Sequence, residues 1–94
     1  MDKKGNDFYN KLKESLLETT VFPTDYMYKF IIPNNLEQKE QLNHIFNFEG
    51  AVIKTNPSKS GKFISFTILQ REKSADTVIE KYQLVSKIKD VISL

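Results

Sequence analysis

The residue types that most often carry catalysis are scarce in this chain. It contains one histidine, His44, and no cysteine, which excludes thiol nucleophiles, thiolate metal sites and disulfides. His44 lies beside Leu42 and Ile45 in a stretch with helical periodicity, where a lone histidine is typical of a surface position. The 12 acidic residues are spread among lysines without a metal-ligand spacing or an evident acid–base pair. The sequence therefore predicts a protein that is not an enzyme and uses no metal or cofactor.

One segment, 56–62, has the composition of a phosphate-binding loop without its pattern. Gly61-Lys62 matches the end of a Walker A motif, which also needs a glycine five positions earlier and Ser or Thr after the lysine. Asn56 and Phe63 occupy those two positions. Lysines and backbone amides around a turn still suit an anion. Two interpretations stay open, an anion site or a polar hairpin with solvated lysines, and we favour the hairpin.

Hydrophobic periodicity predicts the elements that position these residues within one domain, 1–94. A disordered tail is expected over 1–6, an amphipathic helix over 7–20 and a βαββαβ core over 24–94. Strands are expected at about 26–32, 51–55, 62–71 and 91–94, and helices at about 35–46 and 74–87, with Asn35 and Ser74 as N-caps. This order is typical of an α+β, ferredoxin-like sandwich, in which two helices cover one face of a four-stranded antiparallel sheet.

Alternation along the strands predicts which face of the sheet is buried. The core face is expected to carry Tyr28, Phe30, Ile32, Ile64, Phe66 and Ile68. The opposite face carries a mixed set: Met27, Lys29, Ile31, Lys54, Phe63, Ser65, Thr67 and Leu69. The extra N-terminal helix must bury its apolar stripe on that open face, on a sheet edge or on another subunit, and all three remain open.

A binding site is expected on the open face and the hairpin beside it. The predicted ligand- or partner-binding residues are Lys29, Lys54, Ser58, Lys62, Phe63 and Ser65. The lysines would meet a carboxylate or phosphate, Phe63 would give apolar contact and the serines would add hydrogen bonds. Ser58 and Ser65, with Pro57 and Gly61, are equally consistent with turn chemistry, which we favour.

Charge and surface composition argue against several classes of partner. The net charge is only +2, whereas binding by phosphate neutralisation usually needs a clear basic excess. RNA-recognition motifs share this element order, but their third strand carries paired aromatics on the open face, and Ser65 stands where the second would be. We find neither a signal peptide nor a membrane span, so a cytoplasmic location is expected.

Three segments together resemble a known family. They are Phe22-Pro23-Thr24, Tyr28-Lys29-Phe30 and Pro57-Ser58-Lys59-Ser60-Gly61-Lys62-Phe63-Ile64-Ser65. In order and spacing they are similar to the YbeD-like family of bacterial domains of unknown function. The resemblance implies a fold similar to ACT domains, small regulatory modules that bind effectors, and it implies no enzyme activity.

These features lead to one expected function and one alternative. We expect a non-catalytic regulatory or adaptor module that binds a partner protein or a small effector. The alternative is a nucleic-acid-binding ferredoxin-like domain. Homo-oligomers through the sheet edges are plausible, because an isolated four-stranded sheet leaves two edges available for pairing.

Overall fold

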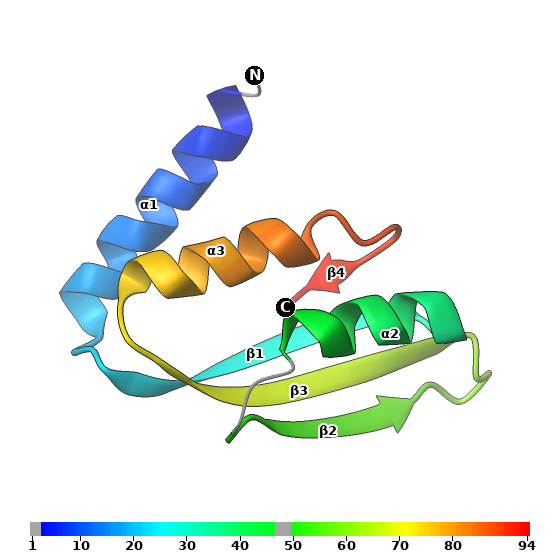
Figure 1. The fold of residues 1–94 in the computed structure, drawn as a ribbon. Helices are drawn as coiled ribbons and strands as arrows, with labels where there is room; N and C mark the ends of the chain where they lie inside the picture. The colour runs from blue at the N-terminus through cyan, green and yellow to red at the C-terminus, as the bar shows by residue number, and fades with distance from the viewer. Residues whose placement is uncertain (1–2, 47–49) are drawn as a thin grey trace.

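The computed structural model describes residues 3–46 and 50–94, and of residues 3–6 the backbone only. Its elements are α1 (Lys3–Thr19), β1 (Thr24–Pro33), α2 (Leu36–Ile45), β2 (Val52–Pro57), β3 (Phe63–Glu72), α3 (Ala75–Val85) and β4 (Ile92–Ser93). The strands form an antiparallel sheet in the order β2-β3-β1-β4, with α2 and α3 over one face (Figure 1). The predicted ferredoxin-like βαββαβ arrangement with an extra N-terminal helix is confirmed.

The N-terminal helix is longer than predicted. It begins at Lys3, so the expected disordered tail over 1–6 is wrong for residues 3–6, while residues 1–2 lie outside the described part. The disordered tail was predicted because residues 1–6 are mostly polar. A helix that has already formed gains one hydrogen bond for each residue it adds, which favours extension even through a polar sequence.

The strand boundaries also move slightly from their predicted places. β2 runs on to Pro57 because Asn56 and Pro57 pair with Ser65 and Ile64 of β3. β4 is shorter than the expected 91–94, with two residues opposite Phe30 and Ile31 of β1. The sheet therefore has one long edge, at β2, and one short edge, at β4.

The central pair, β1 and β3, supplies most of the core. These strands pair along their full lengths, from Thr24 opposite Glu72 to Pro33 opposite Phe63. The predicted core residues are all buried on the covered face, beneath the helices: Tyr28, Phe30, Ile32, Ile64, Phe66 and Ile68. Alternation of apolar residues thus identified the buried face correctly.

Both covering helices begin at a capping side chain, as expected. The Oδ1 atom of Asn35 accepts a hydrogen bond from the Gln38 N–H at 3.0 Å. Ser74 Oγ accepts one from the Thr77 N–H at 3.4 Å, and Thr77 Oγ1 accepts one from the Ser74 N–H at 3.4 Å. Such bonds satisfy first-turn N–H groups that have no partner within the helix.

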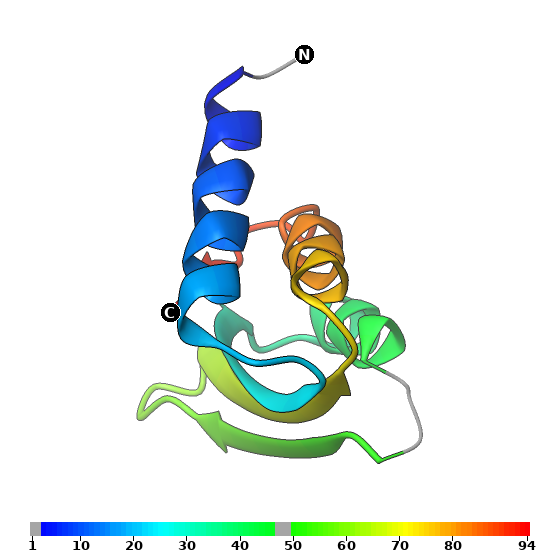
Figure 2. The ribbon, with the colours of Figure 1, turned by 90° about the vertical axis from the view of Figure 1, so that its left-hand side faces the viewer.

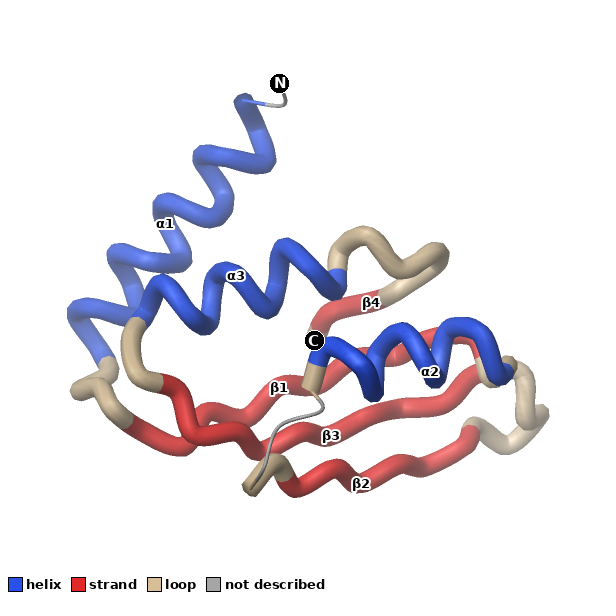
Figure 3. Tube along the Cα trace, viewed as in Figure 1, coloured by secondary structure: helices blue, strands red, loops and turns tan. Residues whose placement is uncertain are grey.

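Helix α1 packs on α3, on the same side of the sheet as the other helices. Its Leu16 joins the core at 6% exposure, and Lys13 Nζ lies 2.7 Å from Asp76 Oδ1 of α3. Its stripe is only partly covered, since Phe8 and Leu17 are each 61% exposed. Figures 2 and 3 show the described helices together on one side of the strands. Of the three places considered for α1, the open face is therefore excluded.

Candidate functional site

The open face consists of the outward-pointing residues of β1, β2 and β3. Its members are Asp25, Met27, Lys29 and Ile31 of β1, Val52, Lys54 and Asn56 of β2, and Phe63, Ser65, Thr67, Leu69 and Arg71 of β3. Lys29 of β1 and Lys54 of β2 both lie opposite Thr67 of β3, one on each side. Adjacent strands are about 4.8 Å apart, so the two lysine Cα atoms are separated by about 10 Å. The register therefore places two cations at the centre of this face.

Exposed apolar side chains lie on both sides of the lysines. Toward the start of β1, Met27, Leu69 and Val52 form one row, exposed by 54%, 36% and 50%. Toward its end, Phe63 is 42% exposed, and Ile92 of β4, opposite Ile31, is 50% exposed. Ile92 lies four residues along the strands from the first row, about 13 Å, and Phe63 lies six residues from it, about 20 Å. The open face therefore has a polar centre with exposed apolar side chains on either side of it along the strands.

The charge of the open face is positive at its centre. In the part of the chain that the structure describes, neither Lys29 nor Lys54 has an acidic partner. Asp25 is the acidic residue on the outward side of these strands, and its Oδ1 lies 3.6 Å from the Arg71 guanidinium. A negatively charged partner would therefore meet the two central lysines without competition from a nearby carboxylate.

The hairpin beside the open face is held by its own hydrogen bonds. The Gly61 N–H donates to Ser58 O at 3.0 Å, and the Phe63 N–H donates to Ser58 Oγ at 3.2 Å. The Lys62 N–H donates to Ser60 Oγ at 3.3 Å, and Gly61 has a φ of 75°, which glycine adopts readily. These groups form the turn, so they leave few donors for an anion, and the favoured turn interpretation agrees with this geometry.

The six predicted site residues divide between two neighbouring places. Lys29, Lys54, Phe63 and Ser65 belong to the open face, and Ser65 Oγ donates to Asn56 O at 3.1 Å. Ser58 lies in the hairpin, where it lines a shallow hollow of about 180 Å³ with Phe63 and Ser65. Lys62, also in the hairpin, lines a separate hollow with Phe63. Phe63 therefore lines both hollows.

A second cluster of polar residues, on the covered face, was not predicted from the sequence. Glu72 is 3% exposed and Gln70 is 7% exposed, although both are polar. The Tyr28 hydroxyl donates a hydrogen bond to Glu72 Oε2, and Lys81 Nζ lies 3.5 Å from the same oxygen. Burial, reinforced by the bond to Glu72, raises the pKa of Tyr28 well above its usual range. The alternation that buries Ile68 also buries Gln70 and Glu72, and that signal was present in the sequence.

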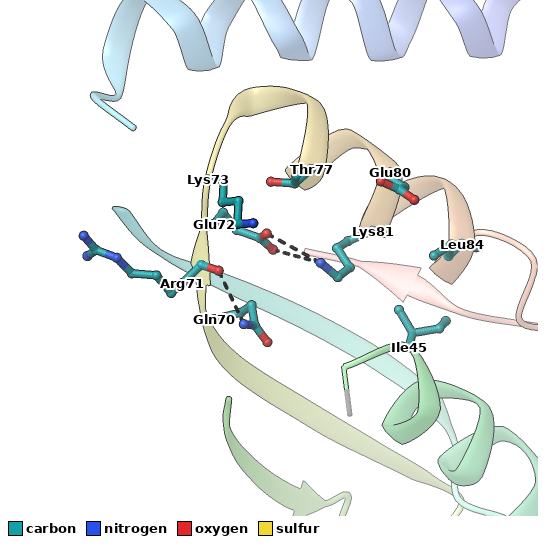
Figure 4. Close-up of a pocket in the computed structure, with 9 residues that line it drawn as sticks. All are labelled: Ile45, Gln70, Arg71, Glu72, Lys73, Thr77, Glu80, Lys81 and Leu84. Carbon is teal, nitrogen blue, oxygen red and sulfur yellow. Dashed lines mark hydrogen bonds and ion pairs between the residues drawn. The ribbon is translucent and has the colours of Figure 1, made fainter. Parts of the chain in front are cut away.

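This cluster borders a cavity between the end of β3 and α3. The cavity has a volume of about 390 Å³. Figure 4 shows its lining, which includes Ile45, Gln70, Glu72, Thr77, Lys81 and Leu84. Gln70 Nε2 donates to Arg71 O at 3.4 Å, while Gln70 Oε1 is buried without a hydrogen-bond partner. An unsatisfied buried acceptor of this kind costs about 1–3 kcal/mol, so it needs an explanation.

A further pair of hydroxyls, partly buried, lies where α3 meets β1. The hydroxyls of Tyr26 and Tyr82 are 3.0 Å apart and share a hydrogen bond. Burial raises the pKa of Tyr82, and the bond to Tyr26 adds to the shift. This pair borders a second cavity, of about 380 Å³, that extends beneath Tyr9 and Leu12 of α1.

Two further findings concern the described residues. None of their helices combines the length and apolar character needed to cross a bilayer. Within the same residues, His, Asp and Glu side chains form no group of three arranged to hold a metal ion.

Comparisons with known proteins identify a family without assigning an activity. Searches among curated proteins and among solved structures gave no match. The model of a family described as "Protein of unknown function (DUF493)" matches residues 18–94. The match spans all four strands with α2 and α3, and it takes in only the last two residues of α1. The chain therefore belongs to the DUF493 family of proteins of unknown function.

Proposed function

We propose that this domain is a non-catalytic adaptor or regulatory module whose open face binds a partner protein. The bound segment carries carboxylates between two apolar anchors. The observation that supports this proposal most directly is the pairing of Lys29 and Lys54 with Thr67 at the centre of a face whose ends are apolar and exposed. Exposed apolar groups gathered on one face are typical of interaction surfaces.

Charge and spacing specify the segment. One anchor lies against Met27 and Leu69, and the other lies about 13 Å along the strands at Ile92 or about 20 Å at Phe63. On a helix, with a rise of about 1.5 Å per residue, this corresponds to apolar residues about nine to thirteen positions apart. Acidic residues midway between them face Lys29 and Lys54. Charge complementarity of this kind favours the encounter and fixes the orientation of the partner.

A protein segment fits this surface better than a small effector or a nucleic acid. Two hollows on the open face hold about 180 and 130 Å³, below the range of about 300–1,000 Å³ usual for small-molecule pockets. A third, of about 540 Å³, is lined by Phe63 and Ile92, the two residues proposed to hold one apolar anchor. Base stacking usually needs more than one aromatic ring, and among the described residues of this face Phe63 is the exposed aromatic. Ser65 occupies the second aromatic position, and its hydroxyl is bonded to Asn56 O.

The same proposal includes the relationship to YbeD-like and ACT domains, the cellular location and the assembly of the protein. The sequence segments described above support kinship with YbeD-like domains, and the βαββαβ order supports an ACT-like regulatory role. The absence of cysteine favours a reducing, cytoplasmic location. The exposed edge of β2 favours homo-oligomers through strand pairing.

Selection from a phage-displayed library of random peptides tests the proposal. We expect enriched peptides to carry Asp or Glu between two apolar residues. The Lys29→Glu/Lys54→Glu variant should bind these peptides at least about tenfold more weakly, since about 1.4 kcal/mol corresponds to that factor. Lys11→Glu/Lys87→Glu is the matched control, because it makes the same charge change at two exposed lysines away from the open face.

Two outcomes would contradict the proposal. The first is enrichment of peptides without acidic residues, or equal binding by the lysine variant and the wild type. The second is binding of a labelled single-stranded RNA 20-mer that weakens steeply with salt and depends on Lys29 and Lys54, which would support the nucleic-acid alternative instead. Thermal unfolding of each variant shows whether the fold is kept.

A further inference from the structure

We propose that the cavity between β3 and α3 is a second binding site, for a small neutral molecule that carries an amide-type N–H group. This site lies on the covered face of the sheet, opposite the surface proposed to bind a protein partner, and does not depend on that proposal. Three features carry the inference: an unsatisfied acceptor at the cavity wall, the charges around it and the volume of the cavity.

The acceptor is the side chain of Gln70. It is 7% exposed, and its Oε1 has no hydrogen-bond partner. Its Nε2 makes one long bond, 3.4 Å, to Arg71 O. Both terminal atoms turn about the last torsion of the glutamine side chain, which is soft, so Oε1 can reach the cavity that the residue lines when the long bond from Nε2 to Arg71 O is given up. A ligand N–H placed there satisfies the acceptor and removes the penalty of its burial.

The surrounding charges select a neutral donor. The nearest carboxylate, Glu72, is already bonded by the Tyr28 hydroxyl and lies 3.5 Å from Lys81 Nζ. Lys73 and Glu80 also line the cavity, whereas the Arg71 guanidinium lies on the open face beside Asp25. An ammonium group at the Gln70 oxygen would meet Lys81, and an anion would meet that oxygen and the Glu72 carboxylate. A neutral amide avoids both repulsions, and its own C=O can turn toward the lysines.

The size of the cavity sets the size of the ligand. Its volume is about 390 Å³, within the range of about 300–1,000 Å³ of small-molecule pockets. Ile45 of α2 and Leu84 of α3 add apolar wall opposite the polar groups, as the close-up in Figure 4 shows. A planar group such as an aromatic amide matches this combination of apolar wall and single acceptor.

Four probes of nearly equal shape separate the possibilities: benzamide, acetophenone, benzoate and benzylammonium. Each is titrated into isotopically labelled protein, and the amide signals are followed by NMR. We expect benzamide to shift the side-chain amide of Gln70 and the backbone signals of 70–73 and 77–84. Acetophenone lacks the N–H group, and the other two are charged, so each should bind at least about tenfold more weakly.

Two variants test the role of the cavity residues. Gln70→Leu removes the acceptor and should weaken benzamide binding at least about tenfold, whereas Gln41→Leu, on the exposed surface of α2, should leave it unchanged. If Gln70→Leu does not fold, Leu84→Trp replaces it, because residue 84 is 39% exposed and the larger ring fills the cavity from its outer side. Equal shifts with all four probes, no shifts with benzamide, or benzamide binding unchanged in the variant that folds would each overturn the proposal.

Discussion

The covered and open faces of the sheet hold their polar groups in opposite ways. On the covered face, the Glu72 side chain is 3% exposed and is fixed by Tyr28 and Lys81. On the open face, Lys29 and Lys54 are exposed and have no acidic partner in the part of the chain described. Removing the partner of a buried charged group lowers the free energy of unfolding by several kcal/mol, whereas removing the partner of an exposed one changes it very little. Stability is therefore concentrated on the covered face, and polar residues of the open face can change at little cost to stability.

The strongest test of this contrast compares two phenylalanines of the same strand. Phe66 is 2% exposed on the covered face, whereas Phe63 is 42% exposed on the open face. Phe66→Ala leaves a cavity and should lower the free energy of unfolding by about 3–5 kcal/mol. Phe63→Ala should lower it by less than about 1 kcal/mol. Urea unfolding of the two variants measures both values, and similar losses would mean that the two faces do not differ as described.

A smaller effect is expected from the ion pair on the covered face. Lys81→Met leaves Glu72 buried with a single hydrogen-bond donor and should lower the free energy of unfolding by about 3 kcal/mol. Adding Glu72→Gln should recover most of this loss, because the amide is neutral and still accepts from Tyr28. Lys87→Met, an exposed lysine after α3, serves as the control. A double variant no more stable than Lys81→Met would show that the charge of Glu72 is not the cause.

The smallest expected effect is that of the Tyr82 hydroxyl on the free energy of unfolding at high pH. Burial raises the pKa of Tyr82 in the folded state, while an unfolded tyrosine ionises near about pH 10. Below that pH both states keep the proton, so Tyr82 contributes nothing to the pH dependence. Above it the unfolded chain loses a proton that the folded chain retains, so the free energy of unfolding falls as pH rises.

One substitution separates the contribution of Tyr82 to this decrease in the free energy of unfolding. Between about pH 9 and about pH 11, Tyr82 should account for about 1.4 kcal/mol of the decline in the free energy of unfolding. Tyr82→Phe should therefore show a decline smaller by that amount in denaturant titrations. Tyr9→Phe is the control, and an equally reduced decline in that variant would contradict the assignment to Tyr82.

Much of the fold could be predicted because the strongest patterns are local. Alternation placed Tyr28 and Phe66 in the core, and side-chain chemistry placed the helix starts after Asn35 and Ser74. Boundaries were less predictable, because they depend on pairing between distant segments. Pro57 ends β2 opposite Ile64, a register that neither segment specifies alone.

The two candidate sites differ in how far the sequence predicts them. The open face follows from alternation, so Lys29 and Lys54 could be assigned to one surface before the strand order was known. The cavity depends on Gln70 and Glu72, which were not among the predicted core residues. Glu72 has its partners in Tyr28 and Lys81, which lie 44 and 9 residues away in sequence. The pairing of β1 with β3 and the packing of α3 on the sheet bring these three groups together.

The unequal edges of the sheet also limit how copies of this chain can associate. β2 offers six residues for pairing, whereas β4 offers two. Two copies joined through β2 about a twofold axis would each use their long edge in the contact. The edges left at the ends of the eight-stranded sheet formed in this way would be the short β4 strands, which provide little for a third copy to pair with. At each end of such a dimer, further pairing would be limited to the two residues of β4 and the part of β1 that β4 leaves uncovered.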